Sequence, residues 1–304
     1  MDVVTGSFGY IGKYITLHLL DLGREVRTIT THPTKPNPFG ARVQAFPYSF
    51  EDPASLIQTL TGATTLYNTY WIRFAYGGLT YEQALKNTHT LFECARQAGV
   101  GKIVHISVTQ ASINSNLPYY SGKGFQEKML AETGIPHAIV RPTLVFGKED
   151  ILVNNIAWMI RRFPLFPIFG SGDYRVQPIF VEDLAQIAVA QANGTNGSIV
   201  DAIGPETFTF KEFLQLITTS LGRTTKLIHM PSPVGIAFGK ILGMFLRDVV
   251  LTENELRGLM QEMLTSTQMP NGLTRFTDWL EQNKDTVGAS YSSEIARHFN
   301  WSTS

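Results

Sequence analysis

The chain has 304 residues, of which 43% are hydrophobic and 16% are charged. A chain of this length and apolar content buries a large core, which excludes a disordered tail and a disulfide-dependent miniprotein. The 25 Lys and Arg residues balance the 25 Asp and Glu residues, so no global positive charge attracts nucleic acid or anionic lipid. We therefore expect a globular protein with a small-molecule partner and no nucleic-acid partner.

The cysteine content and the length of the apolar segments indicate in which cellular compartment the protein is expected. The single cysteine, Cys94, cannot form an internal disulfide, and the first residues read as folded structure rather than a secretion signal. The longest apolar stretch, residues 234–246, is shorter than the about 20 residues that cross a bilayer. We expect a cytoplasmic protein without a transmembrane segment, and we leave its oligomeric state open.

Short β-branched segments alternate with helical patterns over the first 200 residues. In chain order, a strand is predicted at 3–5, a helix at 10–22, strands at 26–30 and 42–46, a helix at 56–60, a strand at 64–69, a helix at 81–98, a strand at 103–107, a helix at 122–132 and a strand at 137–141. Strands that alternate with helices form parallel sheets covered on both faces. The sequence therefore predicts an α/β fold with a doubly wound parallel sheet.

The pattern changes beyond residue 148, where helices are separated by Pro-rich and Gly-rich connections. We expect a nucleotide-binding Rossmann domain over residues 1–147. A smaller, mostly helical substrate lobe is expected over residues 148–304, with parts that return to the sheet. The apolar character of this lobe favours a hydrophobic or amphipathic substrate, but the sequence does not identify it.

A glycine-rich turn, TGSFGYIG at residues 5–12, joins the first predicted strand to the first predicted helix. A pyrophosphate needs bare backbone and a helix N-terminus at such a place. Gly6 permits the tight turn, Gly9 lets phosphates approach the main chain, and Gly12 lets the helix pack closely on the strand. The alternative is an ordinary strand-to-helix turn without a ligand. The predicted cofactor-binding residues here are Gly6, Ser7, Phe8, Gly9, Tyr10, Ile11 and Gly12.

The end of the second predicted strand bears on the choice between NAD and NADP. An NAD-selective site usually has an acidic residue there for the ribose hydroxyls, whereas residues 28–35 contain no carboxylate. Thr31, His32 and Lys35 could instead face a 2′-phosphate, through a hydroxyl and two basic groups. We therefore expect NADP as the cofactor, with NAD as the alternative.

Tyr119 and Lys123 lie four residues apart at the start of a helical pattern, so their side chains share one face. A phenol with a pKa near 10 is a poor base at neutral pH, and an opposite charge nearby lowers that pKa by about 1–3 units. The Lys123 ammonium, together with an oxidised nicotinamide, would let Tyr119 exchange a proton with a substrate oxygen. Thr109, or alternatively Ser107, could orient a substrate carbonyl, although either hydroxyl could instead bond local backbone.

The sequence supports neither metal binding nor serine-dependent hydrolysis. The seven histidines show no paired spacing, so the sequence does not predict a metal site. The serines lack the G-x-S-x-G elbow of a hydrolase.

Five ordered landmarks resemble the short-chain dehydrogenase/reductase superfamily, in its extended and atypical branches of NAD(P)-binding epimerase, dehydratase and reductase-like proteins. They are the glycine turn, the Asn87 helix leading into GVGKIVHIS at 99–107, the Tyr119/Lys123 pair, RPTLVFG at 141–147, and QPIFVEDLA at 177–185. The resemblance implies a Rossmann sheet of about seven strands. It also implies a C-terminal lobe that shapes the substrate pocket and hydride transfer at the nicotinamide.

The sequence departs from this family at two places. Ser49 stands where the family usually has an Asp that touches the adenine, so Ser49 is the candidate adenine contact here. The small residues common after the fourth strand are replaced by NTYWIRF at 68–74, which would crowd or reshape the cofactor groove. Tyr70 and Trp71 either line a pocket or fill the core.

Three functions follow from these features. The first is an NAD(P)-dependent oxidoreductase that acts on a carbonyl or alcohol, with Tyr119 as acid and base, Lys123 as its electrostatic partner and a cofactor contact, and Thr109 as the orienting hydroxyl. The second is a sensor or accessory subunit that binds NAD(P)H without turnover. The third is an epimerase or dehydratase with a tightly bound cofactor.

Overall fold

The computed structural model describes all residues of the chain except 232, 235–236, 238–242 and 299–304. The chain divides into two compact units. Unit 1 comprises Met1–Pro142 and Val181–Ala202, and unit 2 comprises Thr143–Phe180 and Ile203–Ser304. Each unit has its own cluster of buried apolar side chains.

Unit 1 is built on a seven-stranded sheet in which all neighbouring strands are parallel. Its strands are β1 (Asp2–Thr5), β2 (Val26–Thr30), β3 (Val43–Pro47), β4 (Thr65–Asn68), β5 (Lys102–Ile106), β6 (His137–Pro142) and β11 (Ser198–Ala202). They are ordered β11-β6-β5-β4-β1-β2-β3 across the sheet. The order changes direction between β1 and β4, and the carboxyl ends of the strands at such a point are where ligands bind in open α/β sheets.

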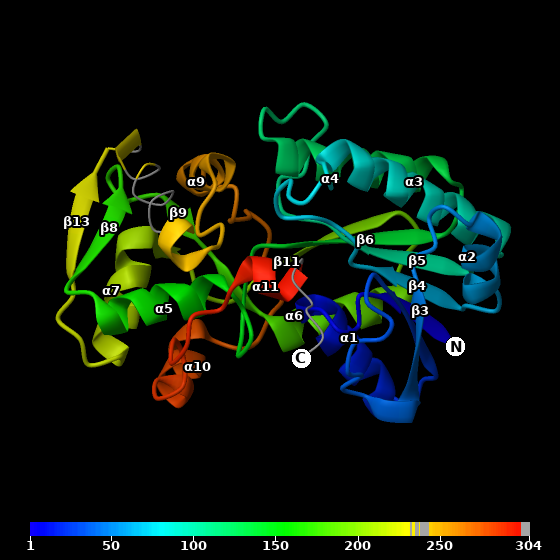
Figure 1. Cartoon of the computed structure of the whole chain (residues 1–304), viewed down its shortest axis with the longest axis horizontal. Coiled ribbons are helices and arrows are strands. Elements are labelled where there is room, and N and C mark those ends of the chain that lie inside the picture. The colour runs from blue at the N-terminus through cyan, green and yellow to red at the C-terminus, as the bar shows by residue number, and fades with distance from the viewer. Residues whose placement is uncertain (232, 235–236, 238–242, 299–304) are drawn as a thin grey trace. The chain divides into compact units, whose positions relative to one another are not determined.

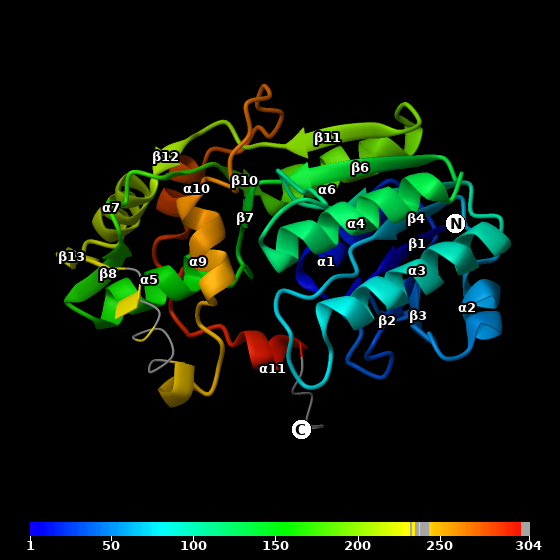
Figure 2. The ribbon, with the colours of Figure 1, turned by 90° about the horizontal axis from the view of Figure 1, so that it is seen from above.

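Helices cover both faces of this sheet (Figure 1). On one face lie α1 (Tyr10–Asp21) and α6 (Val181–Ala190), and on the other lie α2 (Pro53–Leu60), α3 (Tyr81–Gln97) and α4 (Pro118–Glu132). Figure 2 shows α3 and α4 lying side by side along the sheet. Because both faces are covered, β1, β4 and β5 are buried along their whole length, including polar residues such as Asp2, Asn68 and His105. The predicted doubly wound α/β fold is confirmed.

Helix α4 begins at Pro118, four residues before the predicted start at residue 122. Proline is favoured in the first turn of a helix because its fixed φ suits the helix and its missing N–H would be unpaired there. The earlier start places Tyr119 in the first turn of α4, while Lys123 lies one turn further on.

Unit 2 combines helices with small sheets. Its helices are α5 (Leu152–Arg162), α7 (Phe210–Ser220), α9 (Glu253–Met260), α10 (Phe276–Asn283) and α11 (Glu294–His298). Its described strands pair as β7 (Leu144–Phe146) with β10 (Pro178–Phe180), β9 (Arg175–Val176) with β12 (Phe208–Thr209), and β8 (Leu165–Phe169) with β13 (Lys226–Met230). Phe276 lies at the centre of its core, with ring centroids 4.7 Å from Phe213 and 5.0 Å from Phe146.

The apolar stretch at 234–246 lies in unit 2, and its residues 235–236 and 238–242 fall outside the described part of the chain. Among the helices that are described, none combines the length and the apolar character that crossing a bilayer requires.

A buried carboxyl group stands at the start of α5. Asp150 accepts hydrogen bonds from Val153 N at 2.6 Å and from Gly147 N at 3.3 Å. Burial raises the pKa of Asp150 to about 7, although these hydrogen bonds oppose the shift. Since the folded-state pKa lies above the unfolded value of about 3.9, the contribution of Asp150 to stability is fully present below pH 4 and is lost as the pH rises toward 7.

We expect Asp150→Asn to remove the loss of stability between pH 4 and pH 8 that ionisation of Asp150 causes, a difference of up to about 4 kcal/mol for three pKa units at about 1.4 kcal/mol each. The amide oxygen can still accept from Val153 N, whereas the amide NH2 replaces the oxygen that accepts from Gly147 N and Asn154 Nδ2, and it faces these donors at every pH. Urea unfolding at pH 8 and pH 4 measures the difference, with the exposed Asp173→Asn as control. The same change in stability relative to the wild-type protein at both pH values would contradict the assignment.

Candidate functional site

The glycine turn of residues 5–12 connects β1 to α1 at the carboxyl edge of the sheet. Gly6 has a φ of +68°, a left-handed conformation that glycine adopts without strain. A Cβ atom on Gly12 would lie 2.3 Å from Gly6 O, and one on Gly9 would lie 3.2 Å from the same oxygen. The helix therefore packs directly on the turn, and a side chain at position 12 would push the two apart.

The backbone N–H groups at the N-terminus of α1 donate no hydrogen bond to a capping side chain. The capping residue is Gly9, and no side chain caps the helix. Ser7, the nearest hydroxyl, turns inward: its Oγ accepts from Thr16 Oγ1 at 2.7 Å, and its N–H donates to Thr28 Oγ1 at 3.0 Å. The first-turn amides at the positive end of the helix dipole therefore suit an anion, and these residues fit the pyrophosphate of a dinucleotide.

The segment after β2 runs beside this turn, because β2 pairs with β1. Thr31 is exposed, and His32 and Lys35 are half-buried. Lys35 N donates to His32 O at 3.1 Å, so both basic residues belong to one turn. Phe8 of the glycine turn stacks on Phe39 at a centroid distance of 6.5 Å.

Ser49 follows β3 in a left-handed conformation, with a φ of +47°. Its neighbours Tyr48 and Phe50 pack against Tyr70 at centroid distances of 4.9 and 5.4 Å. Tyr48 is buried and hydrogen-bonds the side chain of Thr5 at the end of β1, and burial raises the pKa of its phenol. Aromatic rings therefore flank the position where the family resemblance places an adenine-contacting residue.

Hydrogen bonds hold the segment after β4 against β1 and β5. Thr69 N donates to Thr5 Oγ1 at 2.7 Å, and Thr69 Oγ1 donates to Thr5 O at 2.6 Å. Asn68 Nδ2 lies 3.1 Å from His105 Nδ1, and Asn68 Oδ1 accepts from Tyr70 N at 3.0 Å. His105 is fully buried, and burial lowers its pKa well below the ordinary value, so its imidazole is neutral at pH 7. These contacts fix the backbone that carries Trp71.

The side chain of Lys123 is enclosed by the Trp71 ring and by the backbone of residues 112–113. Glycines on both sides of Lys123 leave room for these two segments. The Lys123 ammonium donates to Ile106 O at 2.7 Å, and its side chain is 3% exposed. A Cβ on Gly122 would lie 2.5 Å from the Trp71 ring, and a Cβ on Gly124 would lie 2.5 Å from Ile113 N. Burial lowers the pKa of Lys123 to about 7, against the opposing effect of the Glu127 carboxylate. The G-K-G sequence therefore allows Trp71 and the 112–113 backbone to close over this lysine.

Trp71 lies against α4 between Tyr119 and Lys123. Its ring centroid is 6.4 Å from that of Tyr119 and 5.4 Å from Lys123 Nζ. Within the described structure, the buried Trp71 Nε1 has no hydrogen-bond acceptor. The sequence left open whether Trp71 lines a site or fills the core, and the structure brings it together with the Tyr119/Lys123 pair.

The two candidate hydroxyls after β5 have different surroundings. Ser107 Oγ donates to Glu127 Oε1 at 2.5 Å, and Glu127 is in turn held by Arg141 at 2.8 and 2.5 Å. Thr109 is fully buried, and its N–H donates to Pro142 O at 3.1 Å. The sequence analysis did not predict Glu127 or Arg141 as residues of the candidate site. The spacing of 119, 123 and 127 along one helix face is the signal that could have found Glu127.

These features define an NAD(P)-binding protein of the Rossmann type. The model of the NAD dependent epimerase/dehydratase family matches residues 3–200. The chain belongs to this family, which is NAD(P)-dependent. The resemblance to the short-chain dehydrogenase/reductase superfamily and the expected cofactor class are thereby confirmed.

Relatives and solved structures of several kinds are similar to this chain. A mitochondrial NADH dehydrogenase [ubiquinone] 1 alpha subcomplex subunit 9 from Arabidopsis thaliana is 24% identical over 77% of this chain, which spans 61% of that relative's length. A Citrobacter sp. triphenylmethane reductase complexed with NADP(H) has a TM-score of 0.76 at 18% identity, over 93% of this chain and 99% of that one. A nucleoside-diphosphate-sugar epimerase from Staphylococcus aureus has a TM-score of 0.71 at 18% identity, over 96% and 99%.

Proposed function

We propose that this chain is an NADP(H)-dependent oxidoreductase that acts on a carbonyl or alcohol group of a small hydrophobic or amphipathic molecule. The observation that carries the proposal is the Tyr119/Lys123 pair on α4, in which a half-buried phenol lies one helical turn from a buried amine held on Ile106 O. Gly6, Gly9 and the first turn of α1 would hold the dinucleotide, which supplies a hydride when bound.

The residues of this chain would then handle the proton. In reduction, Tyr119 would donate its phenolic proton to the substrate oxygen, and a positive charge on Lys123 would stabilise the phenolate that remains. With a pKa of about 7, Lys123 carries that charge in about half of the molecules at pH 7 and in fewer as the pH rises. Thr109 is proposed to orient the substrate oxygen, and because it is fully buried, the residues around it would have to move before it could touch a substrate.

The preference for NADP rests on the turn after β2. His32 and Lys35 belong to one turn directly after β2, the strand that pairs with β1, and their basic groups suit a 2′-phosphate. The NADP(H)-bound reductase that shares the fold over nearly its whole length supports the same choice.

Transfer of deuterium from NADPH labelled at nicotinamide C4 tests the proposal directly. Purified protein is incubated with each labelled C4 epimer and a panel of aldehydes, quinones and triphenylmethane dyes. We expect loss of absorbance at about 340 nm and deuterium in the reduced product from one epimer only. Labelled nucleotide that is bound and never consumed would overturn the proposal, whereas substrate change without net nucleotide oxidation would indicate an epimerase or dehydratase.

A nucleotide-binding protein without turnover is the second candidate, and the position of Trp71 favours it. The indole covers Lys123 and contacts α4 at Gly122, beside Tyr119, so a nicotinamide ring that approached this pair would have to displace it. The NADH dehydrogenase subunit among the relatives supports the same reading. If this candidate holds, NADPH changes the tryptophan fluorescence of the wild-type protein more than that of Trp71→Phe, which keeps three other tryptophans, and neither protein consumes NADPH with any substrate.

A further inference from the structure

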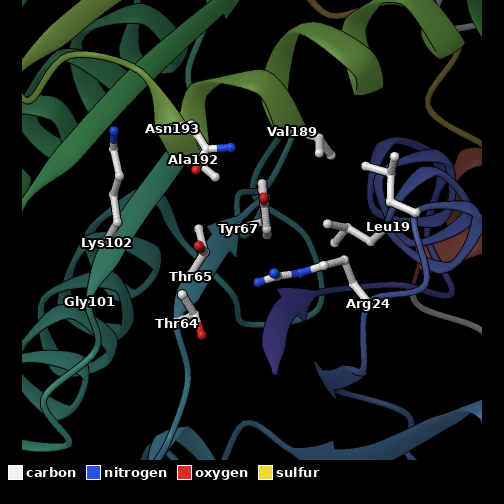
Figure 3. A pocket seen from close by; sticks show the side chains of 11 residues that line it. Leu19, Arg24, Thr64, Thr65, Tyr67, Gly101, Lys102, Val189, Ala192 and Asn193 are labelled. Atoms are coloured by element: carbon white, nitrogen blue, oxygen red, sulfur yellow. The ribbon is translucent and has the colours of Figure 1, made fainter.

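A cavity of about 380 Å³ lies in unit 1 at the amino edge of the sheet, opposite the glycine turn (Figure 3). It is formed by the end of α1, the segment before β2, the starts of β4 and β5, and the residues at the end of α6 and just after it. Its volume lies within the range of about 300–1,000 Å³ that small-molecule sites occupy in proteins. None of the residues that we assign to the nucleotide or to the Tyr119/Lys123 pair lines it.

Two cations line this cavity, and only one of them is neutralised. Arg24 donates from Nε and Nη2 to the Asp2 carboxylate at 2.8 and 3.1 Å. Lys102 is 8% exposed and donates to the Gly194 carbonyl at 2.7 Å, and no carboxylate of the described residues lies within 4.0 Å of its Nζ. Burial lowers the pKa of Lys102 from its ordinary value. The cavity therefore carries one uncompensated positive charge.

Most of the remaining lining residues are apolar or carry a hydroxyl group. Leu19 on α1, Leu22 just after α1 and Val189 on α6 are its larger aliphatic residues, and Leu22 is 58% exposed. Figure 3 shows Leu19 and Val189 on one side of the cavity and Lys102 on the other. An occupant that satisfies both sides carries a negative group at one end and an aliphatic body at the other.

We propose that this cavity binds an aliphatic monocarboxylate, with the carboxylate at Lys102 and the chain against Leu19 and Leu22. A buried ammonium that holds only a neutral carbonyl gains a charge-assisted hydrogen bond when a carboxylate arrives. The match is to a single negative charge, because Arg24 is already paired with Asp2 and would not neutralise a second one. The aliphatic chain gains stability mainly from contact with Leu22, whose side chain is 58% exposed, because Leu19 and Val189 are already 1% and 8% exposed.

An NMR titration of isotope-labelled protein with octanoate tests the proposal. Acetate, which has the carboxylate without the long chain, and 1-octanol, which has the chain without the charge, are titrated separately as controls. We expect octanoate to shift the backbone amide resonances of residues 64–67, 101–102 and 192–194, and to bind about tenfold or more tightly than either control compound. Shifts centred on residues 5–12, or equal binding of octanoate and 1-octanol, would overturn the proposal.

Substitutions in the cavity test which residues contact the carboxylate and which contact the aliphatic chain. Lys102→Met should weaken octanoate binding about tenfold or more, while the exposed Lys86→Met should leave it unchanged. Ala192→Leu narrows the cavity without altering its charge and should also weaken binding, whereas Ala190→Leu, at the exposed end of α6, should not. This second pair keeps the test decisive if Lys102→Met does not fold. Unchanged affinity in the folded cavity variants would refute the site.

Discussion

Tyr119→Phe is expected to lower kcat for NADPH-dependent reduction by about a hundredfold or more and to leave the Kd for NADPH within about twofold. Phenylalanine keeps the ring that packs at 6.4 Å from Trp71 and removes only the hydroxyl. If the hydroxyl supplies the proton in the transition state, its loss affects the chemical step and not the binding of the nucleotide. Stopped-flow loss of nucleotide absorbance, with fluorescence titration for binding, separates the two.

The control for this experiment is Tyr76→Phe, which removes a phenol that is 38% exposed and lies outside the proposed site. Its kcat and Kd should match those of the wild-type protein. Unchanged turnover in Tyr119→Phe would remove Tyr119 from the chemistry. Equal loss of turnover and binding would show that the hydroxyl acts in nucleotide binding rather than in the chemical step.

Gly12→Ala is expected to weaken NADPH binding by about a hundredfold or more and to destabilise unit 1 by about 1–3 kcal/mol. The added Cβ would lie 2.3 Å from Gly6 O, which is a backbone atom and cannot rotate away. The turn and the start of α1 must therefore separate, and the amides that face the pyrophosphate lose their arrangement. Nucleotide fluorescence titration and urea unfolding measure the two effects.

Gly9→Ala provides a graded comparison at the same turn. Its Cβ would lie 3.2 Å from Gly6 O, so a shift of a few tenths of an ångström accommodates it and we expect a smaller loss of affinity. Asp21→Ala, at the exposed last position of α1, should bind NADPH as the wild-type protein does. An affinity in Gly12→Ala equal to that of Asp21→Ala would contradict the proposed pyrophosphate site.

Parts of the fold that depend on neighbouring residues could be predicted from the sequence. The alternation of strands and helices in unit 1 follows from local periodicity, and the first six strands of its sheet lie within one residue of the predicted ones, whereas no strand was predicted at β11. The glycine turn could be located because its strand, turn and helix are contiguous over residues 2–21. The predicted start of α4 at residue 122 is four residues too late, because Pro118 rather than the apolar pattern marks the first turn of this helix.

Parts of the candidate site that join distant segments could not be predicted. Trp71 and Lys123 are far apart in the chain, and only the packing of the β4 loop on α4 brings the indole over the ammonium. The glycines on both sides of Lys123 can be seen in the sequence. The sequence does not show that Trp71 and the backbone of residues 112–113 pack against them. The bond between Ser107 and Glu127 likewise depends on how α4 lies across β5 and β6.

A parallel α/β sheet, a glycine turn suited to a pyrophosphate, and a tyrosine and a lysine on one helix face all follow from the order of the amino acids in this chain. These properties depend on residues within about one helix or strand length of each other, where backbone geometry sets which side chains share a face. The enclosure of Lys123 beneath Trp71, and the place of Lys102 in a cavity at the opposite edge, follow instead from packing in three dimensions. Burial and the approach of charges depend on contacts between segments that periodicity does not pair.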